Sequence, residues 1–313
     1  MNSIDSPPPK RSSLGALAPY YAYRVGAAIA RFFPEPVVLR LAQGIAGLVS
    51  ARAGKPGSRR QMIERHLQRA HDHKLDEASL KKSVKEAYVS YARYWVESFR
   101  LPDKSPADLD ATLSYEGLGN LESALSLGKG VILCLPHLGG WDYGGAWLAT
   151  HGYPMSVVVE PVEPPELFEW FADLRNNLDL KVVPLGPSSA ISVLKTLRSG
   201  GIVALLSDRD LTRDGPEVSF FGEMTTLPAG PITLGLRTGA PVLPTTIYFK
   251  ADGGHHGVIR PALELERRCD SLKDDINRCT QVLADELALL IRAAPEQWHL
   301  FQPNWPSDPG YSN

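Results

Sequence analysis

A histidine and an aspartate five residues apart stand at the end of an apolar run in the middle of the chain. The run Val131–Leu135 has the length and β-branched content of a buried strand, and Pro136-His137-Leu-Gly-Gly-Trp-Asp142 follows it. Residues five apart on one continuous helix would point about 140° apart, so the two side chains can meet only if the chain turns between them. The glycines at 139 and 140 permit a turn. We expect His137 to lie on a strand-to-helix turn with Asp142 beside it.

This pair predicts general-base chemistry on a hydroxyl group. A neutral imidazole can take the proton of an alcohol near pH 7, while a carboxylate on the other ring nitrogen fixes the tautomer and stabilises the imidazolium. We therefore predict His137 as the general base and Asp142 as the residue that orients it. The thiol of Cys134 is expected to pack in the core, because residues three apart on a strand face opposite sides of the sheet. Since the sequence lacks a Gly-x-Ser-x-Gly motif, the reacting hydroxyl is expected to come from the substrate.

A second pair with the same spacing, His71 and Asp76, serves as an internal control. It lies in a charged stretch with no apolar strand before it, so we interpret it as exposed polar residues near a helix end. Context, and not spacing alone, therefore distinguishes His137 and Asp142.

Alternating strands and helices are predicted to position the turn. The predicted strands are Val131–Leu135, Met155–Val159, Lys181–Val183, Gly201–Ser207 and Val242–Lys250, and the predicted helices are Asp142–Thr150, Pro165–Leu178, Ser188–Ser199, Pro231–Thr238 and Ser271–Ala293. This order predicts an α/β fold with a central, mainly parallel sheet flanked by helices. We expect a Pro- and Ser-rich flexible tail at residues 1–15 and a single domain at 16–313, in which 16–100 is mostly helical and 101–313 forms the α/β core.

Polar residues follow the predicted strands at the edge where open α/β sheets bind ligands. Glu160 follows one strand, Ser207-Asp208-Arg209-Asp210 follows another, and Arg213 lies just beyond. Each could form an ordinary ion pair in a loop. Arg175, on the helix after Glu160, could hold a phosphate or pair with that glutamate. Together with His137, these residues are expected to converge on one site.

The composition indicates a globular protein that is not exported. A chain of 313 residues with 43% hydrophobic residues can fill a substantial core. Its three cysteines leave an odd thiol and show no metal-ligand spacing, so we expect a reducing compartment and no metal site. The N-terminus lacks an apolar signal core, and no run of about 18 uncharged apolar residues occurs, so no membrane span is expected.

The formal net charge of -2 hides a basic N-terminal third, in which residues 1–100 carry 17 Lys and Arg against 8 Asp and Glu. Aromatic residues alternate with arginines over residues 20–33, and an apolar segment follows at 37–51. Such helices suit an anionic membrane surface. The alternative is that they are ordinary amphipathic helices that pack on the core. Because no nucleic-acid-binding motif accompanies the charge, nucleic acid is not an expected partner.

Taken together, these motifs resemble the bacterial lysophospholipid-acyltransferase-like family, which includes the lauroyl and myristoyl transferases of lipid A synthesis. The resemblance covers roughly residues 20–305 and rests on the His-x4-Asp turn, Ser207–Asp210, Phe220–Gly222 and Arg237–Pro244. Two longer stretches, Tyr91–Pro102 and Asp208–Gly222, are similar to the phosphatidylinositol mannoside acyltransferase branch. Asp142 favours that branch, because the lipid A branch usually has Glu in the orienting place.

The resemblance implies a glycerolipid-acyltransferase-like fold with an N-terminal helical, membrane-facing segment. It implies an acyl-CoA donor, typically palmitoyl-CoA, and transfer to the 6-hydroxyl of the mannose on the inositol 2-position of a phosphatidylinositol mannoside. The enzyme would be peripheral, on the cytoplasmic face of the plasma membrane, and would need no cofactor, metal or obligatory protein partner.

The resemblance also assigns roles to individual residues. His137 and Asp142 carry over as the catalytic pair, and an acidic residue after the Gly201–Ser207 strand is expected to assist them. Either Asp208 or Asp210 could fill that place. The residues expected to contact the donor or the head group are Glu160, Arg175, Arg209 and Arg213. Donors at the strand ends or at the Pro228–Pro231 turn are expected to bind the oxyanion.

Other activities are also compatible with the sequence. An acyl-CoA thioesterase would use the same base to activate water, and a lipid A type lauroyl or myristoyl transferase would use another acceptor. A non-catalytic membrane-binding protein is a third class of function. The carboxylates predicted at the strand ends argue against this class, because binding alone does not need a positioned base.

Overall fold

The apolar runs of the sequence pair into one central sheet in the computed structural model of the protein, which describes residues 13, 15–51 and 58–311. The strands of this sheet in the described residues are, in spatial order, β1 (Leu113–Glu116), β9 (His255–Ile259), β8 (Val242–Phe249), β2 (Val131–Leu135), β5 (Ile202–Leu206), β3 (Met155–Val159) and β4 (Leu180–Pro184). All neighbours are parallel except β8 and β9. The predicted α/β fold with a mainly parallel sheet is therefore confirmed.

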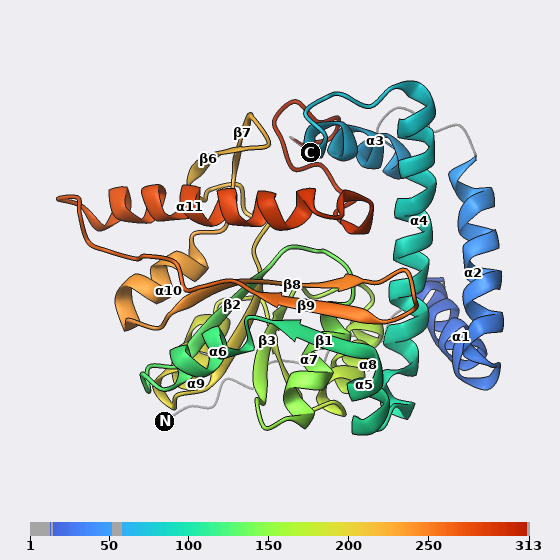
Figure 1. Cartoon of the computed structure of the whole chain (residues 1–313), viewed down its shortest axis with the longest axis horizontal. Coiled ribbons are helices and arrows are strands. Elements are labelled where there is room, and N and C mark those ends of the chain that lie inside the picture. Colours follow the sequence, from blue (N-terminus) through green and yellow to red (C-terminus); the bar gives the residue numbers. More distant parts are fainter. Residues whose placement is uncertain (1–12, 14, 52–57, 312–313) are drawn as a thin grey trace.

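Helices cover both faces of the sheet (Figure 1). The core helices and 3₁₀ turns are η1 (Leu101–Asp103), α5 (Pro106–Thr112), α6 (Leu118–Leu125), α7 (Trp141–Thr150), α8 (Pro165–Asn176), α9 (Ser189–Arg198), α10 (Gly230–Thr238), α11 (Leu272–Arg292) and η2 (Pro295–Gln297). One hydrophobic cluster joins α9, α10 and α11 to one face of β2, and a second joins α6 and α7 to the other face. Burial on both faces explains why the central strands read as continuous apolar runs.

Strand β2 shows how alternation divides the core. Ile132 and Cys134 belong to the cluster with α11, whereas Leu133 and Leu135 belong to the cluster on the opposite face. Burial raises the pKa of the Cys134 thiol to about 12, so the thiol stays protonated. The prediction that Cys134 packs in the core is confirmed.

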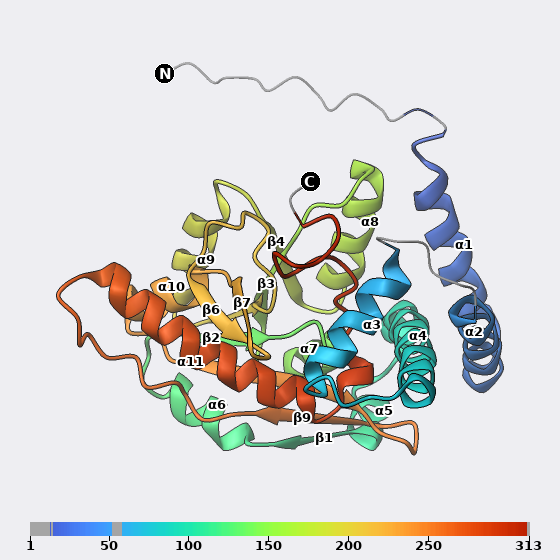
Figure 2. The same ribbon diagram turned by 90° about the horizontal axis from the view of Figure 1, so that it is seen from above.

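Residues before the sheet form α1 (Ala18–Phe32), α2 (Glu35–Ser50), α3 (Arg59–Ala70) and α4 (Glu77–Arg100), a helical layer at one end of the sheet (Figure 2). His71 caps the C-terminal end of α3, and the Asp76 side chain caps the N-terminal end of α4. The control pair therefore lies at helix ends, as predicted. No described helix is both long and apolar enough to cross a membrane.

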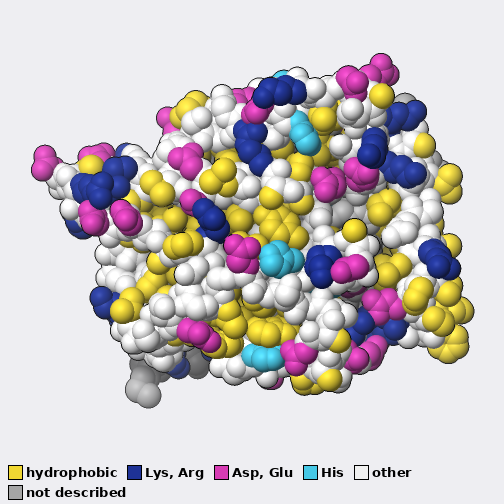
Figure 3. Space-filling model, in the orientation of Figure 1, with side chains coloured by type: hydrophobic (Ala, Val, Ile, Leu, Met, Phe, Trp, Pro, Cys, Tyr) yellow, Lys and Arg dark blue, Asp and Glu magenta, His cyan; other side chains and the backbone are white. Residues whose placement is uncertain are grey.

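Helices α1 and α2 bury one face against the rest of the molecule and expose a second face that is also apolar. Ala27, Ala30 and Val38 pack against Phe99 of α4 and Phe171 of α8. Hydrophobic side chains cover the outer edge of the molecule that these helices form, on the right of Figure 3. This apolar face of α1 and α2 comprises Tyr21, Val25, Ile29, Phe32, Phe33, Val37, Leu41, Ile45, Leu48 and Val49. Phe32 is 84% exposed and Leu48 is 73% exposed, so nothing in the described chain covers them.

The predicted tail lies outside the described residues except for residues 13 and 15, and it stays a prediction.

Several elements were not predicted from the sequence. Strand β1 at the edge of the sheet and β9 next to it are short and only partly apolar, so their pattern is weak. The hairpin of β6 (Glu217–Phe220) and β7 (Glu223–Thr226) turns at Phe221 and Gly222, both with positive φ. A phenylalanine in the left-handed region is uncommon, which explains why the turn signal was missed.

Candidate active site

His137 lies on a tight turn between β2 and α7, as predicted. Gly139 has a φ of 64°, and a Cβ atom there would collide with the Ile247 carbonyl oxygen, so the turn requires glycine. The Gly139 N–H donates to the carbonyl of Gln297 at 3.0 Å, and the next amide donates to Ile247 at 2.9 Å. The turn is therefore tied to β8 on one side and to the C-terminal segment on the other.

The carboxylate that contacts His137 is Asp208. Its Oδ1 lies 2.7 Å from His137 Nδ1, and its Oδ2 accepts the His137 backbone N–H at 2.9 Å. Strands β2 and β5 are parallel neighbours in which Leu135 is paired with Leu206. Two residues further along each strand, the chain therefore brings positions 137 and 208 side by side.

The electrostatics of this pair suit a general base. A carboxylate only accepts hydrogen bonds, so His137 Nδ1 carries the proton and Nε2 keeps its lone pair. Asp208 is completely buried, whereas 27% of the His137 side chain is exposed. Burial would raise the pKa of Asp208, but the charge of His137 and hydrogen bonds from His137 and Trp298 outweigh it and lower that pKa. Asp208 therefore stays ionised behind the imidazole.

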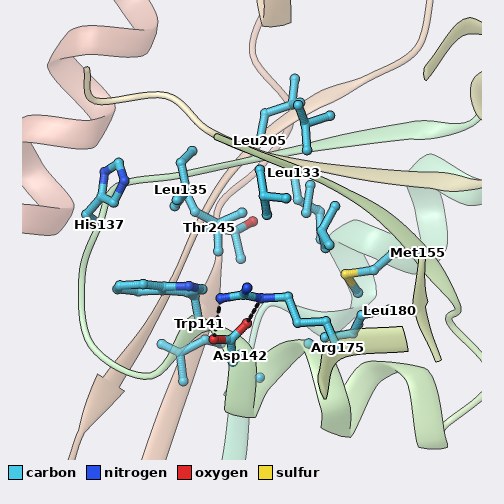
Figure 4. Close-up of a pocket in the computed structure, with 18 of the residues that line it drawn as sticks. Leu133, Leu135, His137, Trp141, Asp142, Met155, Arg175, Leu180, Leu205 and Thr245 are labelled. Carbon is cyan, nitrogen blue, oxygen red and sulfur yellow. Dashed lines mark hydrogen bonds and ion pairs between the residues drawn. The ribbon is translucent and has the colours of Figure 1, made fainter. Parts of the chain in front are cut away.

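Asp142 has different partners. Its Oδ1 accepts from Arg175 Nε at 2.8 Å, and its Oδ2 accepts from Arg175 Nη2 at 3.0 Å and from the Tyr94 hydroxyl at 2.7 Å. Figure 4 shows Asp142 and Arg175 together, with the Trp141 ring between them and His137. The prediction that Asp142 orients His137 is wrong.

The reason for this difference is the start of α7. Because Asp142 lies in the first turn of that helix, its side chain projects toward α8 and α4 and away from the turn that carries His137. A carboxylate in a first turn is also favoured by the helix dipole. Of the two roles left open for Arg175, the pairing with Glu160 is not formed, because the guanidinium is engaged by Asp142 and Glu160 faces Arg209 at 3.5 Å.

The other predicted residues lie in the loop after β5. Asp210 accepts from the Thr212 amide and hydroxyl and from the Gly215 amide, so it shapes this loop. Arg213 has its guanidinium 4.6 Å from the centre of the Tyr311 ring. Of the two aspartates that the sequence left open, Asp208 is thus the one in contact with His137. Substrate contacts by Glu160, Arg175, Arg209 and Arg213 stay predictions.

Two cavities meet at His137. The first cavity, of about 240 Å³, lies between the sheet and helices α7 and α8, and its apolar lining includes Leu133, Leu135, Leu148, Val157, Phe171 and Ile247. The second cavity, of about 690 Å³, lies toward α9 and α10, and its lining includes Val193, Leu194, Thr212, Leu234, Arg209 and Arg237. His137 and Glu160 line both cavities. A molecule in either cavity can therefore reach the imidazole.

Sequence reasoning missed the C-terminal contribution to the site. The Trp298 indole N–H donates to Asp208 Oδ2 at 2.7 Å, and the Asn304 amide donates to the Asp208 carbonyl at 3.0 Å. No local pattern announces contacts between residues about 90 positions apart. The Trp- and Pro-rich composition of residues 298–305 was the one available signal.

A partly exposed imidazole backed by a buried carboxylate, between two largely apolar cavities, can deprotonate a hydroxyl group next to an apolar acyl group. The chain belongs to the bacterial lipid A biosynthesis acyltransferase family, whose sequence model matches residues 9–307. It is therefore an acyltransferase.

Individual relatives narrow the comparison. The chain is similar to the phosphatidylinositol mannoside acyltransferase of Mycobacterium tuberculosis (strain CDC 1551 / Oshkosh), with 38% identity over 98% of this chain and 95% of that protein. It is 34% identical to the protein of the same name from Mycolicibacterium smegmatis, over 95% of both chains. A lipid A biosynthesis acyltransferase of Haemophilus influenzae is 26% identical over 62% of this chain and 59% of that protein. These matches confirm the resemblance inferred from the motifs.

Proposed function

We propose that this acyltransferase moves a fatty acyl chain, most readily palmitoyl, from acyl-CoA to the 6-hydroxyl of the mannose on the inositol 2-position of a phosphatidylinositol mannoside. The observation that carries the proposal is the His137–Asp208 pair at the junction of the two cavities. The printed names of the two mycobacterial relatives support the acceptor.

In the proposed mechanism, His137 Nε2 removes the proton of the mannose hydroxyl as its oxygen attacks the thioester carbonyl. A carbon–oxygen bond forms, the carbon–sulfur bond then breaks, and the proton passes from the imidazolium to the departing CoA thiolate. Asp208 stabilises the imidazolium through the 2.7 Å contact at Nδ1. General-base assistance of this kind contributes roughly 10²- to 10⁴-fold in rate.

The two cavities suggest how the substrates divide. The first cavity is enclosed by apolar side chains of the sheet, α7 and α8, and we assign the acyl chain to it. The second cavity carries Arg209 and Arg237, which suit the phosphates of CoA or of the acceptor lipid. The N-terminal end of α10 and its Pro228–Pro231 turn also line the second cavity, and amides there are our candidates for the oxyanion site.

Asp142 takes a positioning role in this proposal. Its contacts with Arg175 and Tyr94 join α7 to α8 and α4, and Asp142 and Arg175 both line the first cavity. Burial and the Asp142 charge raise the pKa of Tyr94, so its hydroxyl remains a donor. The three side chains would therefore hold the walls of the acyl site together.

We further propose that the enzyme works as a peripheral protein on the cytoplasmic face of the plasma membrane. The apolar face of α1 and α2 is the supporting observation, because so large an exposed patch is unusual on a soluble surface. Arg24 and Arg40 lie on the same two helices and could attract anionic lipid head groups. An anionic bilayer is therefore the proposed occupant of this face.

The test is an assay with palmitoyl-CoA labelled in its acyl group, with and without phosphatidylinositol mannoside. We expect label in the lipid when the acceptor is present, and a loss of at least about 10²-fold in His137→Ala. His71→Ala is the matched control, because His71 has the same spacing to an aspartate but caps a helix away from the site. Label that appears only in free fatty acid would instead identify a thioesterase.

A further inference from the structure

The C-terminal segment of residues 297–305 makes several backbone contacts with the turn that carries His137. The Gln297 carbonyl accepts the amide of Gly139, and the amide of His299 donates to the His137 carbonyl at 2.6 Å. Leu138 and Trp298 form an isolated antiparallel bridge. This segment, drawn in red to dark red in Figure 2, lies beside the blue helix α3, and the contact between His66 and the Leu300 carbonyl joins the two. The backbone of the turn is thus fixed by residues at the far end of the chain.

The same segment reaches the carboxylate behind the imidazole. Trp298 is 4% exposed, and its indole N–H lies 2.7 Å from Asp208 Oδ2. That oxygen also accepts the His137 amide, which leaves Oδ1 for the imidazole. An indole nitrogen can only donate, so this contact favours the ionised carboxylate in one rotation about its Cβ–Cγ bond.

We propose that Trp298 is a positioning residue for acyl transfer: its indole N–H locks the Asp208 carboxylate so that Oδ1 faces His137. This inference rests on the proposed role of His137 as general base. Without the indole donor, the carboxylate keeps its charge but can rotate away from the line of the imidazole. The expected result is a lower kcat with an almost unchanged KM, because Trp298 lines neither cavity.

The magnitude follows from the hydrogen bond. A hydrogen bond from a neutral donor to a buried carboxylate contributes more free energy than one between two neutral groups. When this bond is removed, part of that free energy no longer serves to hold the imidazole in its orientation. We expect kcat of Trp298→Phe to fall by about ten-fold, with KM for both substrates within about two-fold of wild type.

Trp305→Phe is the matched control. Trp305 lies in the same segment and is buried like Trp298, and its indole N–H also makes one hydrogen bond, to the Phe220 carbonyl at 3.2 Å. Both variants remove a buried indole donor, but only one of those donors faces Asp208. If kcat falls equally in the two variants, in step with their loss of thermal stability, Trp298 is merely structural and the proposal is overturned.

A double-variant comparison isolates the route through the carboxylate. In an Asp208→Asn background, the side-chain amide of the asparagine replaces the carboxylate that the indole N–H held in place. Adding Trp298→Phe to this variant should therefore reduce kcat no further. A further ten-fold loss in the double variant would show that Trp298 acts independently of Asp208, against the proposal.

A gentler variant covers the case in which Trp298→Phe folds poorly. Incorporation of benzothienylalanine at position 298 replaces the indole N–H by sulfur and keeps the fused-ring shape, so packing is preserved. We expect the same fall in kcat, and full activity would refute the proposal. If the wild-type enzyme acylates no lipid at all, the result counts against the proposed function and not against the role of Trp298. Failure of the proposed function and failure of this inference can therefore be distinguished.

Discussion

Replacing Asp208 by asparagine tests which carboxylate serves His137, the proposed general base. The change keeps the size of the side chain and removes its charge. In the native site Oδ1 faces the imidazole N–H, and Oδ2 accepts from the His137 amide and the Trp298 indole. Every partner of the carboxylate is thus a donor. An asparagine must turn its own NH₂ group toward at least one of them.

Either orientation of the amide damages the base. If NH₂ faces the former Oδ2 position, it opposes two N–H groups that have no other acceptor in this geometry. If the amide flips, NH₂ faces the ring, and His137 must present Nδ1 as an acceptor and carry its proton on Nε2. The imidazole then cannot take the proton of the substrate.

The expected loss combines two effects. A charged hydrogen bond contributes about 1.5–3 kcal/mol, and the wrong tautomer removes general-base assistance of roughly 10²- to 10⁴-fold. We therefore expect Asp208→Asn to lower kcat on the order of 10³-fold. The assay is the initial rate of labelled acyl transfer to phosphatidylinositol mannoside, with thermal unfolding measured in parallel.

Asp142→Asn provides the comparison. It breaks the two-point contact with Arg175, whose side chain is only 15% exposed, and leaves a largely buried guanidinium without its carboxylate. We expect a loss of roughly 3 kcal/mol in the free energy of unfolding and a smaller effect on kcat of the folded enzyme. Near-normal turnover by Asp208→Asn, together with a stable but inactive Asp142→Asn, would refute this reasoning and restore Asp142 as the partner of His137.

Three further predictions test other parts of the structure. Phe32→Ser, on the apolar face of α1 and α2, should weaken flotation with anionic liposomes, whereas Leu289→Ser, on an exposed position of α11, should not; equal effects would contradict the proposed membrane face. Burial, and after it the charge of the neighbouring His137, lowers the pKa of His299 to about 3, against about 6.5 in an unfolded chain. The unfolded state thus binds more protons between these values, so stability falls as the pH drops below about 6.5. The loss by pH 4.5 should be about 3 kcal/mol, and His299→Gln should flatten this slope in denaturant titrations. Gly139→Ala should displace the turn that carries His137 and abolish transfer, whereas Gly152→Ala, also at positive φ but with open space around it, should lose only about 1 kcal/mol of stability and keep activity.

Much of the α/β fold could be predicted because its central strands are apolar runs between turn signals. The predicted strands Val131–Leu135 and Met155–Val159 match β2 and β3 residue for residue. Strand β9, which lies between β1 and β8, was missed because its sequence His-His-Gly-Val-Ile lacks a clear pattern and the strand is held mainly by these two neighbours. Local sequence thus defined the strands from β2 to β4 better than the side of the sheet that β1 and β9 form.

The residues of the candidate site, too, could be predicted only where their neighbours in space are also neighbours in sequence. His137 could be recognised because its strand, its glycines and its turn are neighbours in sequence. Its partner could not, because the choice of Asp208 depends on β5 lying next to β2 although two strands, β3 and β4, intervene along the chain. Trp298 depends on the folding of the C-terminal segment onto that same edge. Contacts that depend on the order of the strands in the sheet cannot be predicted from the spacing of residues along the chain.

The most direct test of the central claim is to map the acylated product. Wild-type protein and His137→Ala are incubated with palmitoyl-CoA and phosphatidylinositol mannoside, and tandem mass spectrometry locates the new ester. We predict one palmitoyl group on the 6-hydroxyl of the mannose at the inositol 2-position, formed by the wild type and almost absent with the variant. An ester elsewhere on the lipid, or the same product formed at a near-normal rate without the imidazole, would contradict the claim.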